Sequence, residues 1–201
     1  ALYGMLVGRY SGQDEVVIGS LSSGRSHMDL ENLVGVFINF LPIKLSPKRE
    51  LKLSAYLNNS HQALVQAYNN QDYPFDLMVD DCIHQRDISR NPFFDTMVNF
   101  HQENDMPGKV DLEMGLLTGT GVSIKPYQSI QEDLFQSVLD FKLDIEAAGN
   151  ALDLYLSYNS KLFSKETMHS FLDQFVELLT VVVNEPGKNL QDYGDWGKEN
   201  G

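Results

Sequence analysis

The alternation of apolar and polar positions predicts a strand hairpin in the last third of the chain. Apolar and charged residues alternate over residues 138–145, and the alternation returns over residues 152–158. Successive side chains of a strand point to opposite faces, so a period of two indicates strands with one apolar face. Gly149 and Asn150 stand between the two runs and suit a tight turn. One face of this hairpin is therefore expected in the core.

Apolar spacing near 3.6 residues predicts helices in three places. Residues 2–10 fit the last turns of a buried helix that ends near Gly12. Another helix is expected over residues 51–68. The third begins after Ser164, a suitable N-cap, carries an unbroken apolar stripe, and ends before Pro186. The residues expected on the buried face of the second helix are Leu53, Leu57, Leu64 and Ala67.

Further strands are expected in the first half of the chain. Residues 16–19 are mostly β-branched and indicate a buried strand, and the small, polar residues 20–27 that follow indicate a loop. Residues 33–45 fit one long strand, in which Pro42 must lie at an edge or a bulge because proline donates no backbone hydrogen bond. Residues 94–100 form the next predicted strand.

Two charged segments that contain proline are expected to be fixed corners. In residues 70–76, Pro74 suits the first turn of a helix that runs to about Ile83, with Asp72 as its N-cap. In residues 86–93, charged side chains are expected to pin the loop by charge-assisted hydrogen bonds, a structural role rather than a catalytic one. The residues of this second corner are Arg86, Asp87, Arg90 and Asn91.

The composition is that of an acidic, folded protein. The 201 residues are 42% hydrophobic, which is enough for one sizeable core or two small ones. Fifteen basic residues against 28 acidic ones give a net charge of −13, which argues against nucleic-acid binding. The acidic surface either serves solubility or matches a basic partner. The single cysteine, Cys82, excludes an internal disulfide and is expected to be a buried, inert thiol.

The ends of the chain give expectations about location and domain limits. No apolar run approaches the roughly 20 residues of a membrane-spanning helix, and no signal-peptide pattern opens the chain, so we expect a cytoplasmic protein without membrane contact. The chain starts without Met and inside a predicted helix, so we expect it to be a piece of a longer protein. Residues 188–201 are polar, acidic and glycine-containing, which predicts a domain over residues 1–187 followed by a linker.

Spacing argues against three kinds of site. The five histidines show no HExxH pattern and no grouping with cysteine, so no metal site is expected. Residues 19–24 follow a strand but lack the glycine-x-serine-x-glycine spacing of a serine hydrolase. Residues 115–121 are rich in glycine but lack the spacing of a phosphate-binding loop, so a turn between strands is expected there.

Two polar residues beside apolar strands are candidates for a functional site. Arg25 stands directly behind Gly24, where it either reaches into a cleft and pairs with a carboxylate or is a solvated loop residue. Asn39 lies inside an apolar strand and needs a hydrogen-bond partner if it is buried. That partner is either backbone or a ligand.

Four motifs, in order, resemble the condensation domain of nonribosomal peptide synthetases. Residues 16–25 look like that family's strand-and-loop segment, and residues 34–39 look like its glycine-x-phenylalanine-valine-asparagine motif. Residues 70–76 are similar to its asparagine-glutamine-aspartate-x-proline-phenylalanine-glutamate motif, with Asp76 in place of glutamate. Residues 86–93 nearly repeat its arginine-aspartate-x-serine-arginine-asparagine-proline motif.

The resemblance covers about residues 1–190 and implies the C-terminal lobe of a two-lobed, chloramphenicol-acetyltransferase-like domain. The implied fold class is α/β, a two-layer sandwich whose mixed, largely antiparallel sheet packs against helices. The complete domain of that family is an acyl or peptidyl transferase of antibiotic and other secondary metabolism. It joins a carrier-bound donor thioester to the amine of a carrier-bound aminoacyl thioester. The family's catalytic histidine-histidine-x-x-x-aspartate-glycine motif belongs upstream and is not in this sequence, so this chain alone is expected to be inactive.

The same resemblance implies supporting roles for residues of this chain and no catalytic one. Arg25 would pair with the aspartate of the upstream motif, and Ser22 and Gly24 would belong to a loop that lines the tunnel between the lobes. Asn39 would lie near the floor of that tunnel, whereas Phe40 stands where the family commonly has Thr or Ser. The motif residues expected to brace the lobe are Gln71, Asp72, Pro74, Arg86, Asp87, Arg90 and Asn91.

The implied partners are other parts of a synthetase. They are the upstream and downstream peptidyl carrier proteins with their 4′-phosphopantetheine arms, the N-terminal lobe of the same domain, and an adjacent adenylation domain; no cofactor is expected to bind this chain directly. Two other functions stay open. The related epimerisation domain shares the fold, although its usual motifs for this lobe are absent here. A noncatalytic module that docks carrier proteins or acts as a scaffold would also fit.

Overall fold

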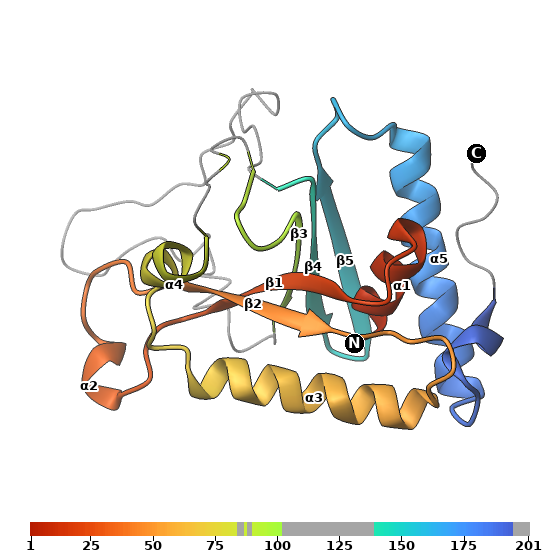
Figure 1. Ribbon diagram of the computed structural model, residues 1–201, viewed down its shortest axis with the longest axis horizontal. Coiled ribbons are helices and arrows are strands. Elements are labelled where there is room, and N and C mark those ends of the chain that lie inside the picture. Colours follow the sequence, from red (N-terminus) through yellow and green to blue (C-terminus); the bar gives the residue numbers. More distant parts are fainter. Residues whose placement is uncertain (84–86, 88–89, 102–138, 195–201) are drawn as a thin grey trace.

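The described part of the chain contains five strands and five α-helices (Figure 1). The computed structural model describes residues 1–83, 87, 90–101 and 139–194. In chain order the elements are α1 (Leu2–Ser11), β1 (Val16–Ser22), α2 (Met28–Glu31), β2 (Asn39–Leu45), α3 (Leu53–Asn69), α4 (Phe75–Cys82), β3 (Thr96–His101), β4 (Phe141–Ala148), β5 (Ala151–Tyr158), α5 (Lys165–Asn184) and the 3₁₀ helix η3 (Leu190–Tyr193).

The strands form one mixed sheet in the order β2-β1-β3-β4-β5. β1 pairs antiparallel with β2 and β4 antiparallel with β5, whereas β3 pairs parallel with both β1 and β4. The predicted mixed sheet packed against helices is confirmed, with parallel and antiparallel pairs equally frequent among the described strands. The predicted hairpin is also confirmed, since Ala148 pairs with Ala151 and Gly149 adopts a φ of 58°, which favours glycine.

The main core lies where the sheet meets α1, α3 and α5. α3 packs on β2, α1 packs on β1 and α5, and α5 packs on β5. The ring of Tyr3 makes edge contacts with Phe141, Phe171 and Phe175 at centroid distances of 6.1 to 6.3 Å. Its hydroxyl is hydrogen-bonded to Thr96, and burial raises the pKa of Tyr3 above its usual value. This neutral pair joins α1 to the middle strand of the sheet.

The apolar stripe predicted for the last helix is confirmed. The Ser164 side chain accepts a hydrogen bond from the Thr167 backbone N–H at 3.1 Å, as expected of an N-cap. α5 then runs to Asn184 and packs its apolar face on the core. Its buried residues are Met168, Phe171, Phe175, Leu178 and Val182.

Four phenylalanines form a second apolar cluster on the face of the sheet opposite the main core. Phe75 of α4 lies 5.5 Å from Phe40, 5.6 Å from Phe93 and 6.1 Å from Phe94, measured between ring centroids. Gly19 and Phe40 alternate with core residues along their strands, so both point to this second face. A Cβ atom at Gly19 would lie 2.3 Å from the Phe94 ring, so this close contact requires glycine.

The strand predicted over residues 33–45 is wrong in its first half. β2 begins at Asn39, opposite Ser22, the last residue of β1. Residues 33–38 are apolar yet project from the surface, and Val34 and Val36 are 103% and 94% exposed. A strand needs a partner, and β1 ends before it could pair with these residues. Pro42 lies in the edge strand, as predicted.

α3 buries only part of the predicted face: Leu53 is buried and Ala67 packs partly buried against the core, as predicted, but Leu57 and Leu64 do not. Leu57 and Leu64 are 38% and 37% exposed, whereas Leu53, Tyr56 and Ser60 are buried. The prediction considered apolar residues alone and therefore left out the small Ser60 and the amphipathic Tyr56. Burial follows the direction in which the helix face points rather than the polarity of each residue. The exposed leucines of α3 therefore face another part of the molecule, described below.

The chain stays packed after the predicted end of the domain, so residues 188–194 do not form a linker. Leu190 and Tyr193 of η3 are buried and belong to the main core. The Arg9 guanidinium donates a hydrogen bond to the Leu190 carbonyl and ties η3 to α1. Two apolar side chains in this otherwise polar stretch hold residues 188–194 against the core. Residues 195–201, the rest of the expected linker, lie outside the described residues.

Two smaller features complete the fold. Cys82 is exposed, so the predicted buried thiol is wrong; α4 is a short surface helix in which only Val79 is buried. Among the described helices, none is both long and apolar enough to cross a membrane.

Candidate functional site

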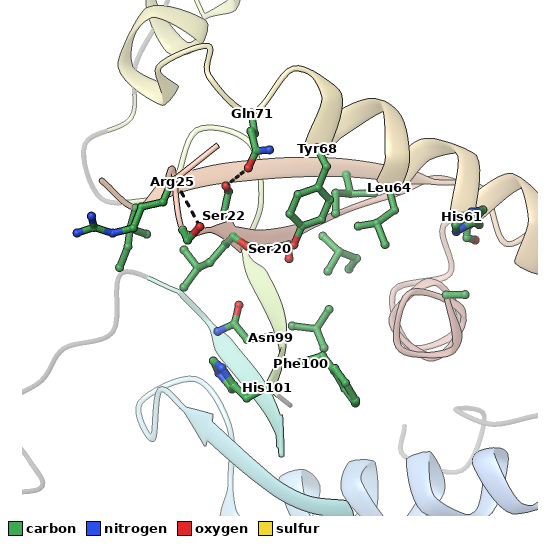
Figure 2. A pocket seen from close by; sticks show the side chains of 18 of the residues that line it. Ser20, Ser22, Arg25, His61, Leu64, Tyr68, Gln71, Asn99, Phe100 and His101 are labelled. Atoms are coloured by element: carbon green, nitrogen blue, oxygen red, sulfur yellow. Dashed lines mark hydrogen bonds between the residues drawn. The ribbon is translucent and has the colours of Figure 1, made fainter. Parts of the chain in front are cut away.

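An open cavity of about 1110 Å³ lies between α3, β1 and β3 (Figure 2). Its walls are the exposed apolar side of α3, residues 20–23, the loop around Arg25, and residues 98–101. Figure 2 shows Leu64 and Tyr68 on the α3 side, with Asn99 and His101 on β3 across from Ser20 and Ser22. The wall combines apolar surface with hydroxyl and amide groups.

Gly24 sets the course of the loop that follows β1. It adopts a φ of 63°, in the left-handed region that favours glycine, and a Cβ atom there would lie 1.7 Å from the Phe37 carbonyl oxygen. Its backbone N–H donates to the Ser22 hydroxyl at 3.1 Å. Gly24 and Phe37, thirteen positions apart in the chain, are therefore held in contact, and only glycine allows it.

Arg25 lines the cavity but binds its own loop. Its guanidinium donates to the carbonyls of Leu30, Glu31 and Gly35, the last two at 3.4 Å. The guanidinium carbon lies 4.4 Å from the centroid of the Phe37 ring, within the range of a cation–π contact. Within the described residues the guanidinium is engaged by backbone carbonyls of its own loop, and the two roles weighed from the sequence stay predictions.

Asn39 holds the segment before α4 through three hydrogen bonds. Its Nδ2 donates to the carbonyls of Gln71 and Tyr73, both at 2.8 Å, and its Oδ1 accepts from the Phe75 backbone N–H at 3.1 Å. Of the two partners considered for Asn39, the structure thus provides backbone. Asn39 is not among the residues that line the cavity, and its place near the tunnel floor stays a prediction.

Gln71 connects this segment to the cavity wall. The Ser22 hydroxyl donates to Gln71 Oε1, and the same hydroxyl accepts from Gly24. Asp72 is not the N-cap of α4, because the cap position is occupied by Pro74 without a side-chain hydrogen bond. The Asp72 carboxylate instead accepts from the Ser26 hydroxyl at 3.1 Å. Both motif side chains therefore fix the loop that follows β1.

The second proline corner is held by its own backbone and by ion pairs. Asn91 Oδ1 accepts from two backbone N–H groups, at 3.0 and 3.2 Å. Arg90 pairs with Asp95 at 3.1 Å and with Asp140 at 3.5 Å, which joins the corner to the start of β4. The Asp87 carbonyl accepts from the Arg90 N–H at 3.4 Å. Pinning by Arg90 and Asn91 agrees with the structural role expected for this corner; Arg86 lies outside the described residues.

Sequence reasoning missed the polar residues that β3 contributes to the cavity. Asn99 is buried, and its Nδ2 donates to Asp144 Oδ1 at 2.9 Å. His101 Nε2 lies 3.9 Å from the same carboxylate oxygen, and Lys142 pairs with Asp144 at 2.7 Å. The signal was present, because an asparagine inside an apolar strand is the pattern that singled out Asn39.

The cavity wall combines neutral hydrogen-bonding groups with apolar side chains. In the part of the chain that the structure describes, no group of three or more His, Cys, Asp or Glu residues could hold a metal. The cavity wall provides neutral hydrogen-bonding groups from Ser20, Ser22 and Asn99, set among apolar side chains. Such a wall can position an uncharged chain by a few directed hydrogen bonds.

Comparison with known proteins shows the family. The model of the condensation domain matches residues 1–196. Tyrocidine synthase 3 from Brevibacillus parabrevis is 33% identical over 194 residues, and gramicidin S synthase 2 from Aneurinibacillus migulanus is 36% identical over 186 residues. The matches cover 96% and 92% of this chain but only 3% and 4% of those proteins. The chain therefore spans a small part of the curated relatives.

Solved structures show the same fold at low sequence identity. The X-domain in its complex with OxyB from teicoplanin biosynthesis has a TM-score of 0.78 at 20% identity, and covers 96% of this chain and 41% of its own. A four-domain nonribosomal peptide synthetase bound to AMP and glycine has a TM-score of 0.75 at 21% identity, over 95% of this chain and 15% of its own. The α/β fold class implied by the resemblance is thus confirmed. Because the family model matches nearly the whole sequence, this chain belongs to the condensation-domain family of nonribosomal peptide synthetases.

Proposed function

We propose that this chain is the C-terminal lobe of a condensation domain that, in the complete synthetase, forms amide bonds between two carrier-bound thioesters. The donor is an acyl or peptidyl group and the acceptor is an aminoacyl group. The chain spans 42% of the matched X-domain and 41% of the matched condensation domain of a monacolin K polyketide synthase, at TM-scores of 0.76 and 0.71. A share of this size supports one lobe of a two-lobed domain.

The observation that carries the proposal is the connection between the family motifs and the cavity wall. Asn39 holds the backbone on either side of Asp72, Gln71 of that segment holds Ser22, and Ser22 holds Gly24. Three stretches that lie apart in the sequence thus meet at one loop that lines a cavity of about 1110 Å³. A wall that is fixed before the substrate arrives suits the positioning of two reactants.

In this proposal this chain positions the substrates, and the other lobe supplies the groups that take part in the reaction. The histidine motif of the family is placed upstream, so no residue of this chain transfers a proton, and the chain alone is inactive. Ser22, Gly24 and Arg25 shape the wall of the tunnel. Arg25 pairs in addition with the aspartate of the histidine motif. A guanidinium carries five N–H donors, so this pairing is compatible with the bonds that Arg25 makes to its own loop.

The proposed partners account for the exposed features of the lobe. The apolar residues 33–38 project beside the cavity and are covered by the N-terminal lobe in our proposal, because an exposed apolar segment of this kind usually marks a contact surface. The cavity admits the 4′-phosphopantetheine arms of the upstream and downstream carrier proteins, whose amide groups match the neutral groups of the wall. An adenylation domain adjoins the lobe in the synthetase.

Amide-bond formation with both loaded carrier proteins tests the proposal. The complete condensation domain that contains this chain should form the peptide product, detected by mass spectrometry, whereas the chain alone should form none. Turnover by the chain alone would refute its proposed inactivity. A complete domain that binds both carriers without forming product would favour the noncatalytic scaffold instead, and inversion of the donor residue without bond formation would favour an epimerisation domain.

A further inference from the structure

The two edge strands of the sheet, β2 and β5, differ in how they are protected. β2 contains Pro42 and Lys44, and proline and lysine are typical of edges that pair with no further strand. β5 is 8 residues long, contains neither residue type, and carries Asp153 as its only charge. Among the described residues, no further strand pairs with its outer side. β5 is therefore an edge that is suited to further pairing.

The even-numbered residues of β5 present their backbone to the outside. The Asn159 N–H donates to the Asp140 carbonyl at 2.9 Å, and this pair continues the register of β4 and β5. In an antiparallel pair, residues that bond the partner strand alternate with residues whose N–H and C=O point away from it. The odd-numbered residues thus bond β4, which leaves the even-numbered ones with outward groups. These residues are Leu152, Leu154, Leu156 and Tyr158.

An apolar stripe of α5 lies on the same side as the open edge of β5. α1 packs on β1 and on α5, so it contacts the flank of α5 that faces the middle of the sheet. On that flank Tyr10 lies within hydrogen-bonding reach of Ser170 and Gln174. The opposite flank, about half a helical turn away, carries the stripe. Its residues are Leu172, Val176, Leu179 and Val183.

The stripe extends from the core to the surface. Its two leucines pack partly buried against the core, whereas its two valines are 46% and 78% exposed. Figure 1 shows α5 beside β5 at one end of the sheet, and the two elements are in contact. The outward backbone of β5 and the stripe of α5 therefore form one surface, named the β5 end face below.

We propose that the β5 end face binds a second copy of this chain across a two-fold axis. The two β5 strands pair antiparallel and join the two sheets, and the two α5 stripes pack on each other above the junction. The stripe residues follow one another at intervals of four, three and four positions, the spacing of apolar seams between paired helices. This inference goes beyond the proposed function and does not rest on it.

A second copy fits both parts of the β5 end face. An extended peptide would pair with β5 but would leave the stripe of α5 open, and a single helix would leave the backbone of β5 unpaired. A two-fold axis places the same surface on both sides of the contact. A second copy therefore supplies a strand and a helix in the arrangement that this surface needs.

The side chains of β5 match those of a second copy when the axis passes Tyr155. Tyr155 then lies opposite its own copy as an aromatic pair, and Asp153 lies opposite Ser157, whose hydroxyl can donate to the carboxylate. On the α5 side, Leu154 lies opposite Leu156. An axis at Asp153 would instead place two carboxylates directly opposite each other, which is unfavourable.

The acidic composition predicts how salt affects the dimer. A net charge of −13 on each copy opposes association at long range. Salt screens this repulsion, whereas main-chain hydrogen bonds and apolar contacts depend on salt much less. The dimer should therefore be tighter at high ionic strength, in contrast to a complex that is held by opposite charges.

Sedimentation velocity of the complete condensation domain tests the proposal. The wild-type domain should form a dimer whose Kd falls as salt rises from about 0.05 M to about 0.5 M. Tyr155→Lys places two lysines opposite each other at the axis, and Val176→Lys places a charge in the stripe, so each should raise Kd at least about tenfold. The control is Leu77→Lys on α4, where the leucine is also 50% exposed; its Kd should stay within about twofold of wild type.

Two results of this experiment would overturn the proposal. One is a wild-type domain that stays monomeric at about 100 μM in high salt. The other is a dimer whose Kd responds no more to Tyr155→Lys and Val176→Lys than to Leu77→Lys. Urea unfolding of each variant shows whether it folds like the wild type.

Engineered cysteines locate the axis. Directly opposite residues that share no hydrogen bonds have Cα atoms about 4.5 Å apart, within the range of a disulfide. With the native cysteines of the domain replaced by serine, Cys82 included, Tyr155→Cys should therefore give a disulfide dimer under mild oxidation. Ser157→Cys is the control, because its copy would lie about 13 Å away along the strand. Equal cross-linking of both variants, or of neither, overturns the proposed pairing.

The adenylation domain of the proposed synthetase is the competing occupant of the β5 end face. The same sedimentation experiment on the condensation domain joined to its downstream domain separates the two. A dimer that persists supports the second copy. A dimer that is lost identifies the downstream domain as the occupant and overturns the proposal. Neither result depends on amide-bond formation, so failure of the proposed function would not affect this inference.

Discussion

Removal of the Asn39 side chain should loosen the whole link between β2, α4 and the cavity wall. Asn39→Ala deletes two hydrogen bonds of 2.8 Å to the carbonyls of Gln71 and Tyr73 and one of 3.1 Å from the Phe75 N–H. The bonds to Gln71 and Phe75 are partly buried, and the one to Tyr73 is exposed, so water can replace only the last of them well.

A partly buried hydrogen bond contributes about 1 kcal/mol, and an exposed one less, so the loss should amount to about 2–3 kcal/mol in the free energy of unfolding. The matched control is Asn70→Ala in the same segment, which removes a single exposed bond of 2.8 Å to the Gln66 carbonyl. This control should cost less than about 1 kcal/mol.

Urea unfolding of the complete condensation domain, with hydrogen exchange at Phe75, measures the effect. The Asn39→Ala variant should show a lower midpoint at similar slope and faster exchange of the Phe75 amide. If Asn39→Ala were no more destabilising than Asn70→Ala, or if the Phe75 amide kept its protection, Asn39 would not hold this segment, and the connection from Asn39 to the cavity loop would have to be abandoned.

Three further changes test other parts of the fold. Gly24→Ala should destabilise by at least about 2 kcal/mol, because φ is left-handed and a Cβ atom would meet the Phe37 carbonyl; urea unfolding no different from wild type would contradict this. Leu178→Ala, at a fully buried site of α5, should lower the free energy of unfolding by about 2–5 kcal/mol, and a value below 1 kcal/mol would argue against the assigned core. Burial and the nearby Asp95 carboxylate raise the pKa of Asp140 above its usual value, so the protonated form favours the fold. This contribution is present below the unfolded pKa and is lost as pH rises through the folded one, so Asp140→Asn should flatten the acid part of the stability profile, and an unchanged profile between about pH 3 and about pH 6 would count against it.

The spacing of apolar residues along the sequence predicted those helices and strands in which buried positions repeat at a regular interval. The β4–β5 hairpin follows from strict alternation and a glycine turn, and α5 follows from its apolar stripe and Ser164 cap. These elements pack one continuous face against the core, so the sequence pattern and the buried surface coincide. The family motifs then gave the fold class that no single periodicity could give.

Other features depend on partners that lie far apart in the sequence. Residues 33–38 have strand-like composition, but β1 ends before it can pair with them. Asp72 looks like an N-cap, yet Pro74 occupies the cap position of α4 and the Asp72 carboxylate accepts from the Ser26 hydroxyl instead. The cavity itself arises where β1 and β3 separate, and no pattern in either strand shows where the pairing stops. Such outcomes are decided by tertiary contacts, which override local propensity.

The packing of η3 bears on how such modules are recombined. Engineers who exchange segments between synthetases need junctions that leave each folded unit intact, and a polar stretch ending in proline and glycine, such as Pro186 and Gly187, is an inviting place to cut. Here Leu190 and Tyr193 are buried beyond that point. A junction at Gly187 would separate these two apolar side chains from the core that they fill. Junctions placed after Gly194 keep Leu190 and Tyr193 with the core that they fill.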